Sequence, residues 1–339
     1  MEGLVDYNAD YEDYTPDNGT DNNSSTDGLG TFISTKSFLA DTLVAINVII
    51  SVIGLGGNGM VIWITGWKMK RTVHTTWYTS LAISDFLFCA CLPLEIVYVL
   101  SSHWPFGQAL CKLTSSALFL NMYSSVFLLV LISTDRCVMV SFPVWSQNHR
   151  TVRKASGVVV LMWVLSAVLT LPALVYRQTK VHGSVTQCYT DYMSLSRHKA
   201  VALSRFICGF VIPFLIIVFC CSVLCVKLRS LTIKSTKPYK VMAALILTFF
   251  ICWVPYHTFV LLEFDLSKYS LDVIQTGLKV GSTLAAANSF INPVLYVFIG
   301  NDFQQTLKRS FMSRIENAMA DDWRTGGLNH SRSKSMEIC

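Results

Sequence analysis

The sequence predicts an all-α membrane protein, a bundle of seven transmembrane helices followed by a short amphipathic eighth helix. Hydrophobic residues make up 52% of its 339 residues and charged residues only 14%, whereas soluble chains carry about 25% charged residues. Apolar stretches long enough to cross a bilayer recur seven times along the chain. These stretches are residues 38–67, 77–100, 112–142, 154–176, 200–228, 241–263 and 271–299.

The distribution of basic residues orients the predicted bundle. The connections after the first, third and fifth stretches carry lysines and arginines but no acid. They are Lys68, Lys70, Arg71, Arg150, Arg153, Lys154, Lys227, Arg229, Lys234, Lys237 and Lys240. Since such residues accumulate on the cytoplasmic side, we expect these connections inside and the N-terminus outside. A basic inner face suits an anionic lipid leaflet, so the basic charge does not imply a nucleic-acid partner.

Residues 1–37 are expected to form a disordered extracellular arm, because they offer almost nothing to bury. Eight acids and one lysine make the arm acidic, so it should attract a basic extracellular protein. Tyr7, Tyr11 and Tyr14 lie among these acids, where tyrosine sulfation and a plain solubilising arm are equally favoured. Three N-glycosylation sequons begin at Asn18, Asn22 and Asn23. The chain start lacks the pattern of a cleavable signal, so the first apolar stretch should direct insertion.

The third stretch, residues 112–142, is expected to be the central helix of the bundle. Between its first residue and Asp135, which precedes Arg136 near the inner end, it carries no charge. Most of the eleven cysteines lie in apolar stretches, where a thiol behaves as a small hydrophobe. Only Cys111 and Cys188 fall at extracellular positions, where disulfides form. We therefore predict a Cys111–Cys188 disulfide that folds the second outer loop over the bundle.

Polar side chains within the apolar stretches predict a hydrated core. Asp85 lies near the middle of the second stretch, and a buried carboxylate there is costly unless it is paired, hydrated or protonated. Other polar residues expected to converge with it are Asn58, Ser125, Asn288, Ser289 and Asn292. Because all of them offer oxygen ligands, which hard cations prefer, they predict a sodium site that includes Asp85 and Ser125.

Two arginines near the outer half of the bundle predict a site for a carboxylate. Arg205 lies inside the fifth stretch, before Pro213, and an arginine within the membrane needs an anion or a water-filled cavity. Arg177 follows the fourth stretch, where extension of its side chain to the membrane interface is the alternative interpretation. Glu95 either lines the same pocket or lies at headgroup level.

Prolines are expected to bend the last two helices. Pro255 follows Trp253 in the sixth stretch, and Pro293 follows Asn292 in the seventh. Proline removes one backbone hydrogen bond and creates a hinge, so both helices should be able to change shape next to polar or aromatic residues.

The C-terminal segment divides into two parts. Residues 301–315 have apolar side chains at helical spacing and are expected to lie along the inner membrane surface as an amphipathic helix. Residues 316–339 are polar and are expected to be a disordered cytoplasmic tail. Its candidate phosphorylation sites are Ser331, Ser333 and Ser335.

Several short motifs together resemble the rhodopsin-like family of G-protein-coupled receptors over nearly the whole chain. They are Gly57-Asn58, residues 81–85, Asp135-Arg136-Cys137, Trp163, Pro213, residues 252–255 and residues 292–296. Residues 124–129, 142–150 and 252–258 are similar to the chemoattractant branch of this family, and within it to chemerin receptors more than to formyl-peptide receptors. No phosphate-binding glycine loop, His-Glu-x-x-His motif or metal-spaced Cys/His set occurs, so an enzyme is not expected.

The resemblance implies a plasma-membrane receptor for a chemerin-like protein or peptide that promotes leukocyte chemotaxis and regulates inflammation. It implies signalling through an inhibitory-type heterotrimeric G protein, with arrestin and receptor kinases as further partners. The implied ligand-binding residues are Arg177, Arg205, Glu263, Tyr98 and Lys279. The implied activation and coupling residues are Asp135, Arg136, Phe249, Trp253, Pro255, Asn292, Pro293 and Tyr296. In this scheme Asp135 restrains Arg136 until the G protein binds, while Asp85, Ser125, Asn288, Ser289 and Asn292 form a sodium and water network.

Three departures from the family pattern bear on function. Cys221 stands where these receptors usually carry a tyrosine that stabilises the active state, which puts the efficiency of activation in question. No acid occurs at residues 235–237, so a second ionic contact to Arg136 is not expected. No acid occurs at residues 118–120 either, which ranks formyl peptides second as ligands and argues against amines.

The sequence leaves rival functions to be weighed. A formyl-peptide or lipid-mediator receptor of the same branch is the nearest alternative. A scavenger that internalises ligand without signalling is a further alternative, because Cys221 replaces the usual tyrosine. The intact Asp135-Arg136-Cys137 motif argues against it. A retinal protein needs a lysine deep in the last stretch, but Lys279 lies near the outer end and residues 285–287 are alanines.

Overall fold

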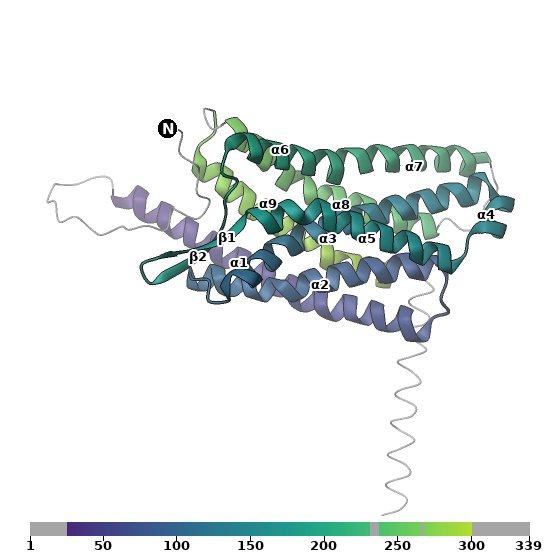
Figure 1. Ribbon diagram of the computed structural model, residues 1–339, viewed down its shortest axis with the longest axis horizontal. Helices are drawn as coiled ribbons and strands as arrows, with labels where there is room; N and C mark the ends of the chain where they lie inside the picture. The colour runs from purple at the N-terminus through teal and green to yellow at the C-terminus, as the bar shows by residue number, and fades with distance from the viewer. Residues whose placement is uncertain (1–25, 231–236, 266–267, 300–339) are drawn as a thin grey trace, which may run out of the picture.

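The computed structural model describes residues 26–230, 237–265 and 268–299. Its long helices run side by side along the longest axis of the molecule (Figure 1). Counted over the described residues, seven helical units build the bundle. They are α1 (Thr26–Trp63) continued by η2 (Ile64–Lys68), α2 (Val73–Ser101), α3 (Gly107–Ser141), α5 (Val152–Tyr176), α6 (Leu195–Phe206) continued by η3 (Ile207–Val211) and α7 (Ile212–Ser230), α8 (Lys237–Leu262) with η4 (Glu263–Asp265), and α9 (Leu271–Ile299).

The predicted bundle of seven membrane helices is confirmed. Six of the described units are long and apolar enough to cross a membrane, and α9 packs against α8 and α1 as the seventh. Helix α1 begins at Thr26, before the predicted start at residue 38. The predicted eighth helix, the cytoplasmic tail with its three serines and the three sequons lie outside the described residues.

Two short elements at opposite ends of the bundle were not predicted (Figure 1). Strands β1 (Arg177–His182) and β2 (Val185–Thr190) form an antiparallel hairpin in which Thr179 lies opposite Cys188. The hairpin turns at Gly183, whose φ of 57° suits glycine. At the other end, the inner connection after the third apolar stretch contains a short helix, α4 (Pro143–His149). Pro143 occupies its first turn, where a proline costs no backbone hydrogen bond.

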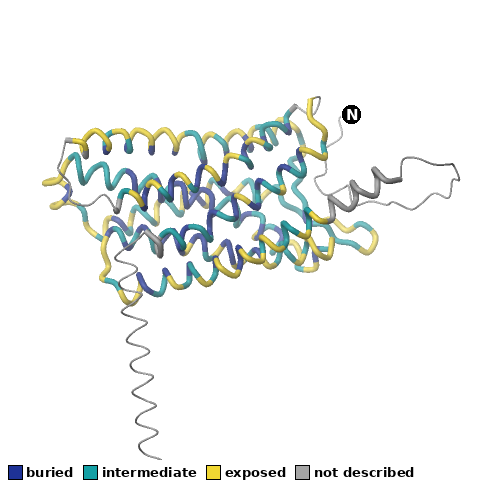
Figure 2. Tube along the Cα trace, turned by 180° about the vertical axis from the view of Figure 1, so that it is seen from behind, coloured by how far each residue is buried: buried dark blue, intermediate teal, exposed yellow. Residues whose placement is uncertain are grey.

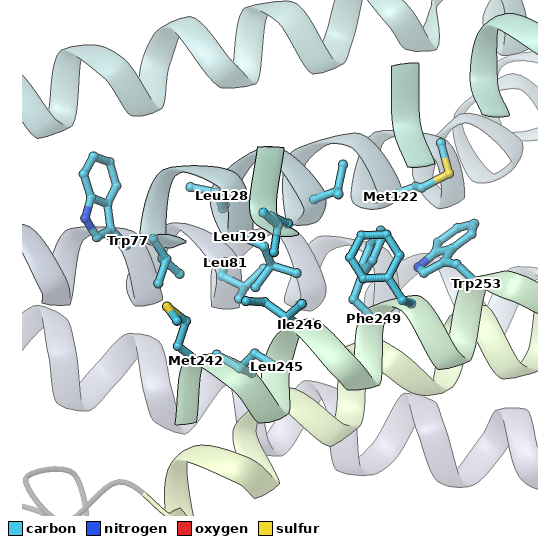
Figure 3. Close-up of a cluster of buried hydrophobic side chains, with 14 of the residues drawn as sticks. Trp77, Leu81, Met122, Leu128, Leu129, Met242, Leu245, Ile246, Phe249 and Trp253 are labelled. Carbon is cyan, nitrogen blue, oxygen red and sulfur yellow. The ribbon is translucent and has the colours of Figure 1, made fainter. Parts of the chain in front are cut away.

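Burial follows from the position of each helix in the bundle. Figure 2 shows the buried residues concentrated toward the middle of the bundle. Among the six helical units that are long and apolar enough to cross a membrane, α3 has the largest buried share. Helices α2, α3 and α8 meet through Leu81, Leu128, Leu129 and Leu245 (Figure 3). In contrast, α7 exposes Phe219 at 67%, which is favourable because a membrane helix faces lipid.

Close packing of α8 against α9 depends on Gly281. A Cβ atom built on Gly281 would lie 2.8 Å from the backbone nitrogen and Cα of Tyr256, which is too close for any side chain. Small residues allow such backbone approach in membrane bundles. The contact lies beside Pro255, so it holds α9 against the predicted hinge of α8.

Candidate functional site

The outer end of the bundle is closed by the hairpin, which the predicted Cys111–Cys188 disulfide joins to α3. The two Cα atoms are 5.8 Å apart and both cysteines are fully buried. Trp104, which is 1% exposed, packs against them, and its backbone N–H donates to the Thr186 carbonyl at 2.8 Å. The Tyr98 hydroxyl accepts from the Cys188 N–H at 3.3 Å. The predicted disulfide is confirmed, and Tyr98 supports the hairpin that covers the mouth.

Arg177, the first residue of β1, is directed along the hairpin. Its Nε donates to Cys188 Sγ at 3.1 Å and its Nη1 to Thr190 Oγ1 at 3.0 Å. Burial lowers the pKa of Arg177, and the negative charge of Glu95 opposes this shift. Glu95 therefore lies within electrostatic reach of the Arg177 guanidinium.

Arg205 is held in an aromatic environment within the outer half of the bundle. Its side chain is 6% exposed, and its guanidinium carbon lies 3.4 Å from the centroid of the Phe119 ring on α3. Its Nη1 donates to the Tyr256 hydroxyl of α8 at 3.2 Å. Among the described residues, no acidic side chain forms an ion pair with Arg205. A buried cation stacked on an aromatic ring and without an acid is suited to bind an anion.

Tyr192 connects the two arginines, and sequence analysis did not identify it. The Tyr192 hydroxyl lies within electrostatic reach of both Arg205 and Arg177. Its ring stacks on His198 with a centroid distance of 4.5 Å. The sequence could have suggested Tyr192 as a site residue, because it lies between Cys188, the predicted outer cysteine, and the helix that carries Arg205.

Glu263, in η4, brings a buried acid to the same region. Its side chain is 8% exposed, and its Oε2 lies 3.7 Å from Nε2 of His198 on α6. Burial raises the pKa of Glu263 to about 8. Lys279, the remaining expected ligand-binding residue, is exposed on α9, where its carbonyl accepts from Ser282 Oγ at 2.9 Å.

A series of aromatic contacts leads from Arg205 toward the core. Tyr256, which bonds Arg205, contacts Trp253 edge to face with a centroid distance of 5.8 Å. The ring centroids of Trp253 and Phe249 are in turn 6.0 Å apart, and both side chains are 1% exposed or less. Figure 3 shows Trp253 and Phe249 together on α8, next to Met122 of α3. Tyr256 is thus the one ring between the Arg205 side chain and Trp253, which is among the expected activation residues.

The structure brings the predicted polar residues together around Asp85, which is fully buried. Asp85 Oδ2 accepts from Asn292 Nδ2 at 2.7 Å. Asn58 Nδ2 donates to the Ser289 carbonyl at 2.8 Å. Three buried oxygens in this core have no hydrogen-bond partner among the described residues. They are Asp85 Oδ1, Asn58 Oδ1 and Asn288 Oδ1.

Asn121 is a central member of this core that sequence analysis missed. Its Oδ1 accepts from Ser84 Oγ at 2.8 Å and from Ser125 Oγ at 3.0 Å, and its Nδ2 donates to Ser289 Oγ at 2.7 Å. The signal was present, because residues four apart share a helix face. Asn121 lies four positions before Ser125 in an otherwise apolar run.

At the inner end of α3, Asp135 does not pair with Arg136 as we expected. The Asp135 carboxylate accepts two bonds from Arg150, from Nε at 2.6 Å and from Nη2 at 2.8 Å. Arg136 Nε has no hydrogen-bond partner among the described residues, and the Arg136 side chain lies against Tyr78 of α2. The expectation that Asp135 holds Arg136 is therefore corrected, because a more distant arginine occupies both carboxylate oxygens.

The remaining expected residues lie on α7 and α9. Cys221 is half-buried on α7. Pro293 lies inside the continuous helix α9 and faces α1, where a Cβ on Gly57 would lie 2.9 Å from the proline ring. Tyr296 belongs to α9, but its side chain lies outside the described residues.

Comparison with known proteins agrees with this geometry. Residues 57–296 match the model of the 7 transmembrane receptor (rhodopsin family). The chain is 44% identical to Chemerin-like receptor 1 of Rattus norvegicus over 315 residues, which cover 86% of this chain and 84% of the relative. It is 42% identical to Chemerin-like receptor 1 of Homo sapiens over 300 residues, 83% and 80% of the two chains. It is 39% identical to the C3a anaphylatoxin chemotactic receptor of Oncorhynchus mykiss over 294 residues, 84% and 80%.

Proposed function

The chain belongs to the rhodopsin family of seven-transmembrane receptors, and from this premise we propose that it detects a chemerin-like protein or peptide through that ligand's C-terminal carboxylate. Its relatives are chemoattractant receptors, so it is a G-protein-coupled receptor and not an enzyme. We further propose an inhibitory-type G protein, arrestin and receptor kinases as its partners, location at the plasma membrane, and roles in leukocyte chemotaxis and inflammation.

The observation that carries the ligand proposal is the environment of Arg205. The guanidinium is buried on the Phe119 ring and has no acid partner among the described residues. A carboxylate would supply the missing charge through two parallel hydrogen bonds. Tyr192 lies within electrostatic reach of both Arg205 and Arg177, which supports Arg177 as a second basic residue of the proposed site. Because residues 118–120 contain no acid of the kind that formyl-peptide receptors carry in this part of the helix, a formyl-peptide receptor is the weaker candidate.

Cells that express the chain provide the test of this function. We expect a synthetic peptide with the C-terminal sequence of chemerin to lower cyclic AMP in a pertussis-toxin-sensitive manner. The same peptide with an amidated C-terminus should be much weaker. A response to formyl peptides or lipids alone would assign another ligand class. Ligand uptake without any change in cyclic AMP would favour a scavenger receptor, the alternative that Cys221 in α7 leaves open.

We also propose that the oxygen cluster around Asp85 holds a sodium ion. The unpartnered oxygens of Asp85, Asn58 and Asn288 fit this ion, since hard cations take oxygen ligands, and Ser125 would add a hydroxyl. Sodium at ten times its Kd should stabilise the folded receptor by about 1.4 kcal/mol. The melting temperature of the purified receptor should therefore rise when choline chloride is replaced by sodium chloride.

Two variants separate this sodium effect from general salt effects. Asp85→Asn removes the only charge in the cluster and should make the melting temperature the same in both salts. Asn47→Ala removes a polar group of α1 that bonds Thr283, outside the cluster, and should keep the sodium dependence. Equal sodium dependence in the receptor and in Asp85→Asn would contradict the proposal.

Glu263 is expected to make binding of a cationic peptide depend on pH. Burial raises the pKa of Glu263 to about 8, so its carboxyl is mostly protonated at pH 7 and ionised at pH 9. A lysine of the ligand pairs only with the ionised form, and binding therefore releases a proton. The ionised fraction rises about tenfold between pH 7 and pH 9, and the affinity should rise by the same factor.

Competition binding with an N-acetylated, lysine-bearing peptide measures this effect, because neither end of that peptide titrates between pH 7 and pH 9. Glu263→Gln should bind with an affinity that does not change over this range. A peptide with norleucine in place of lysine should also show a flat profile on the unaltered receptor. A pH dependence that persists in Glu263→Gln would assign the titration to another group.

A further inference from the structure

Arg150, at the junction of α4 and α5, forms a three-way contact at the inner end of the bundle. Its Nε and Nη2 donate to the two oxygens of Asp135 on α3, at 2.6 Å and 2.8 Å. The same Nη2 lies 3.1 Å and 3.2 Å from the ring nitrogens of His74 on α2. Arg150 thus joins α2, α3 and the second inner loop.

The local backbone fixes Arg150 in this place. The Arg150 N–H donates to the Ser146 carbonyl at 3.0 Å and so caps α4. The next residue, Thr151, caps the start of α5 with its side chain. The Asp135 and Arg150 side chains are 10% and 22% exposed. A bidentate pair with so little exposure is stronger than an ion pair on the surface.

This pairing decides which group is available to the G protein. Both Asp135 oxygens are occupied by Arg150, so Asp135 does not hold the adjacent Arg136, whose Nε has no hydrogen-bond partner among the described residues. We propose that Arg150 is a positioning residue for coupling, which keeps Asp135 from capturing Arg136. This inference rests on the proposed function, in which Arg136 meets the G protein.

Removal of Arg150 has a defined physical consequence. The Asp135 carboxylate would then have only His74, at 3.6 Å, as a basic partner among the described residues. A charge with little solvent exposure and no partner is unfavourable, and Arg136, the next residue in α3, is the nearest remaining arginine in the chain. Arg136 would turn toward Asp135 and away from the cleft. Coupling should therefore fall, whereas it would rise if Arg150 restrained the inactive receptor.

Nucleotide exchange on purified G protein, measured in membranes with matched receptor density, tests this consequence. Arg150→Ala should lower peptide-stimulated exchange by about tenfold, the effect of one charge pair of ordinary strength. Arg150→Ala combined with Asp135→Asn should return exchange to the level of Asp135→Asn alone, because no carboxylate remains to capture Arg136. Arg153→Ala removes the same charge from an exposed position nearby and should match the unaltered receptor.

The position of Arg136 can be measured without any G protein. In receptor labelled with ¹⁵N-arginine, the Arg136 side-chain signal is assigned by its loss in Arg136→Lys. Its Nε proton should be protected from exchange with solvent in Arg150→Ala and unprotected in the double variant. A receptor that drives no nucleotide exchange would contradict the proposed function, while this spectrum would still decide the role of Arg150.

Three results would overturn the proposal. The first is unchanged or increased exchange in Arg150→Ala. The second is a double variant that couples as weakly as Arg150→Ala, which would mean that Arg150 contacts the G protein directly or folds the loop. The third is an Arg136 signal in Arg150→Ala that exchanges as in the unaltered receptor.

Discussion

Replacement of Arg205 by alanine is expected to weaken binding of a peptide with a free C-terminal carboxylate by about 30-fold to about 3,000-fold, because loss of one partner of a buried charge pair costs about 2–5 kcal/mol. Arg205 is 6% exposed, its guanidinium stacks on the Phe119 ring, and its Nη1 donates to the Tyr256 hydroxyl. Competition binding on intact cells measures the loss. Arg205→Lys keeps the charge but not the paired hydrogen bonds, so its affinity for the peptide should lie between those of the unaltered receptor and Arg205→Ala.

A double-mutant cycle with the peptide separates the carboxylate from other effects of the substitution. The unaltered receptor should bind the amidated peptide about as weakly as Arg205→Ala binds the acid, and Arg205→Ala should not distinguish the acid from the amide. Arg197→Ala is the matched control, since Arg197 is an exposed arginine of the same helix that contacts Met193. Equal losses for acid and amide peptides on Arg205→Ala would show that Arg205 supports the fold and does not bind the carboxylate.

The sequence predicted those features that follow from the cost of burying a polar group in lipid. The seven helices follow from apolar length, and the Asp85 cluster follows from the need of a buried acid for partners. The same argument identified Arg205 as a residue that requires an anion. The predictions for Asp85 and Arg205 concern residues whose own chemistry conflicts with their apolar surroundings, and such a conflict is visible in one sequence.

Features that depend on contacts between distant segments were not predicted. Tyr192 lies within electrostatic reach of two arginines and does not conflict with its local sequence. Asn121 is a polar residue in an apolar run, but its partners lie on α2 and α9, far from it in sequence. The pairing of Asp135 with Arg136, which the family resemblance implied, was wrong because Arg150, at the end of α4, donates to both oxygens of the carboxylate. The hairpin was not predicted, because a strand is recognised by regular alternation of buried and exposed side chains. The two strands in residues 177–190 show little of that alternation.

Removal of the Cys111–Cys188 disulfide is expected to affect more of the outer site than any other pair of substitutions. A disulfide that closes a long loop typically stabilises a fold by about 2–5 kcal/mol, and this one closes a loop with a sequence separation of 77. It also fixes β2, on which Arg177 and Tyr98 depend for contacts with Cys188. The double variant Cys111→Ala/Cys188→Ala should therefore lose both receptor density at the cell surface and affinity for the acid peptide.

Flow cytometry of surface epitope and peptide binding on the same cells measure these two losses separately. The control is Cys91→Ala/Cys225→Ala, which removes two free thiols from α2 and α7 and should leave both quantities unchanged. The affinity loss identifies the role of the hairpin, because the remaining surface receptors should also become insensitive to Arg177→Ala once Cys188 no longer positions that side chain. If the double variant reached the surface normally and bound the acid peptide with unchanged affinity, Arg177 and the hairpin would have no part in holding the ligand, and the carboxylate would have to be bound by Arg205 alone.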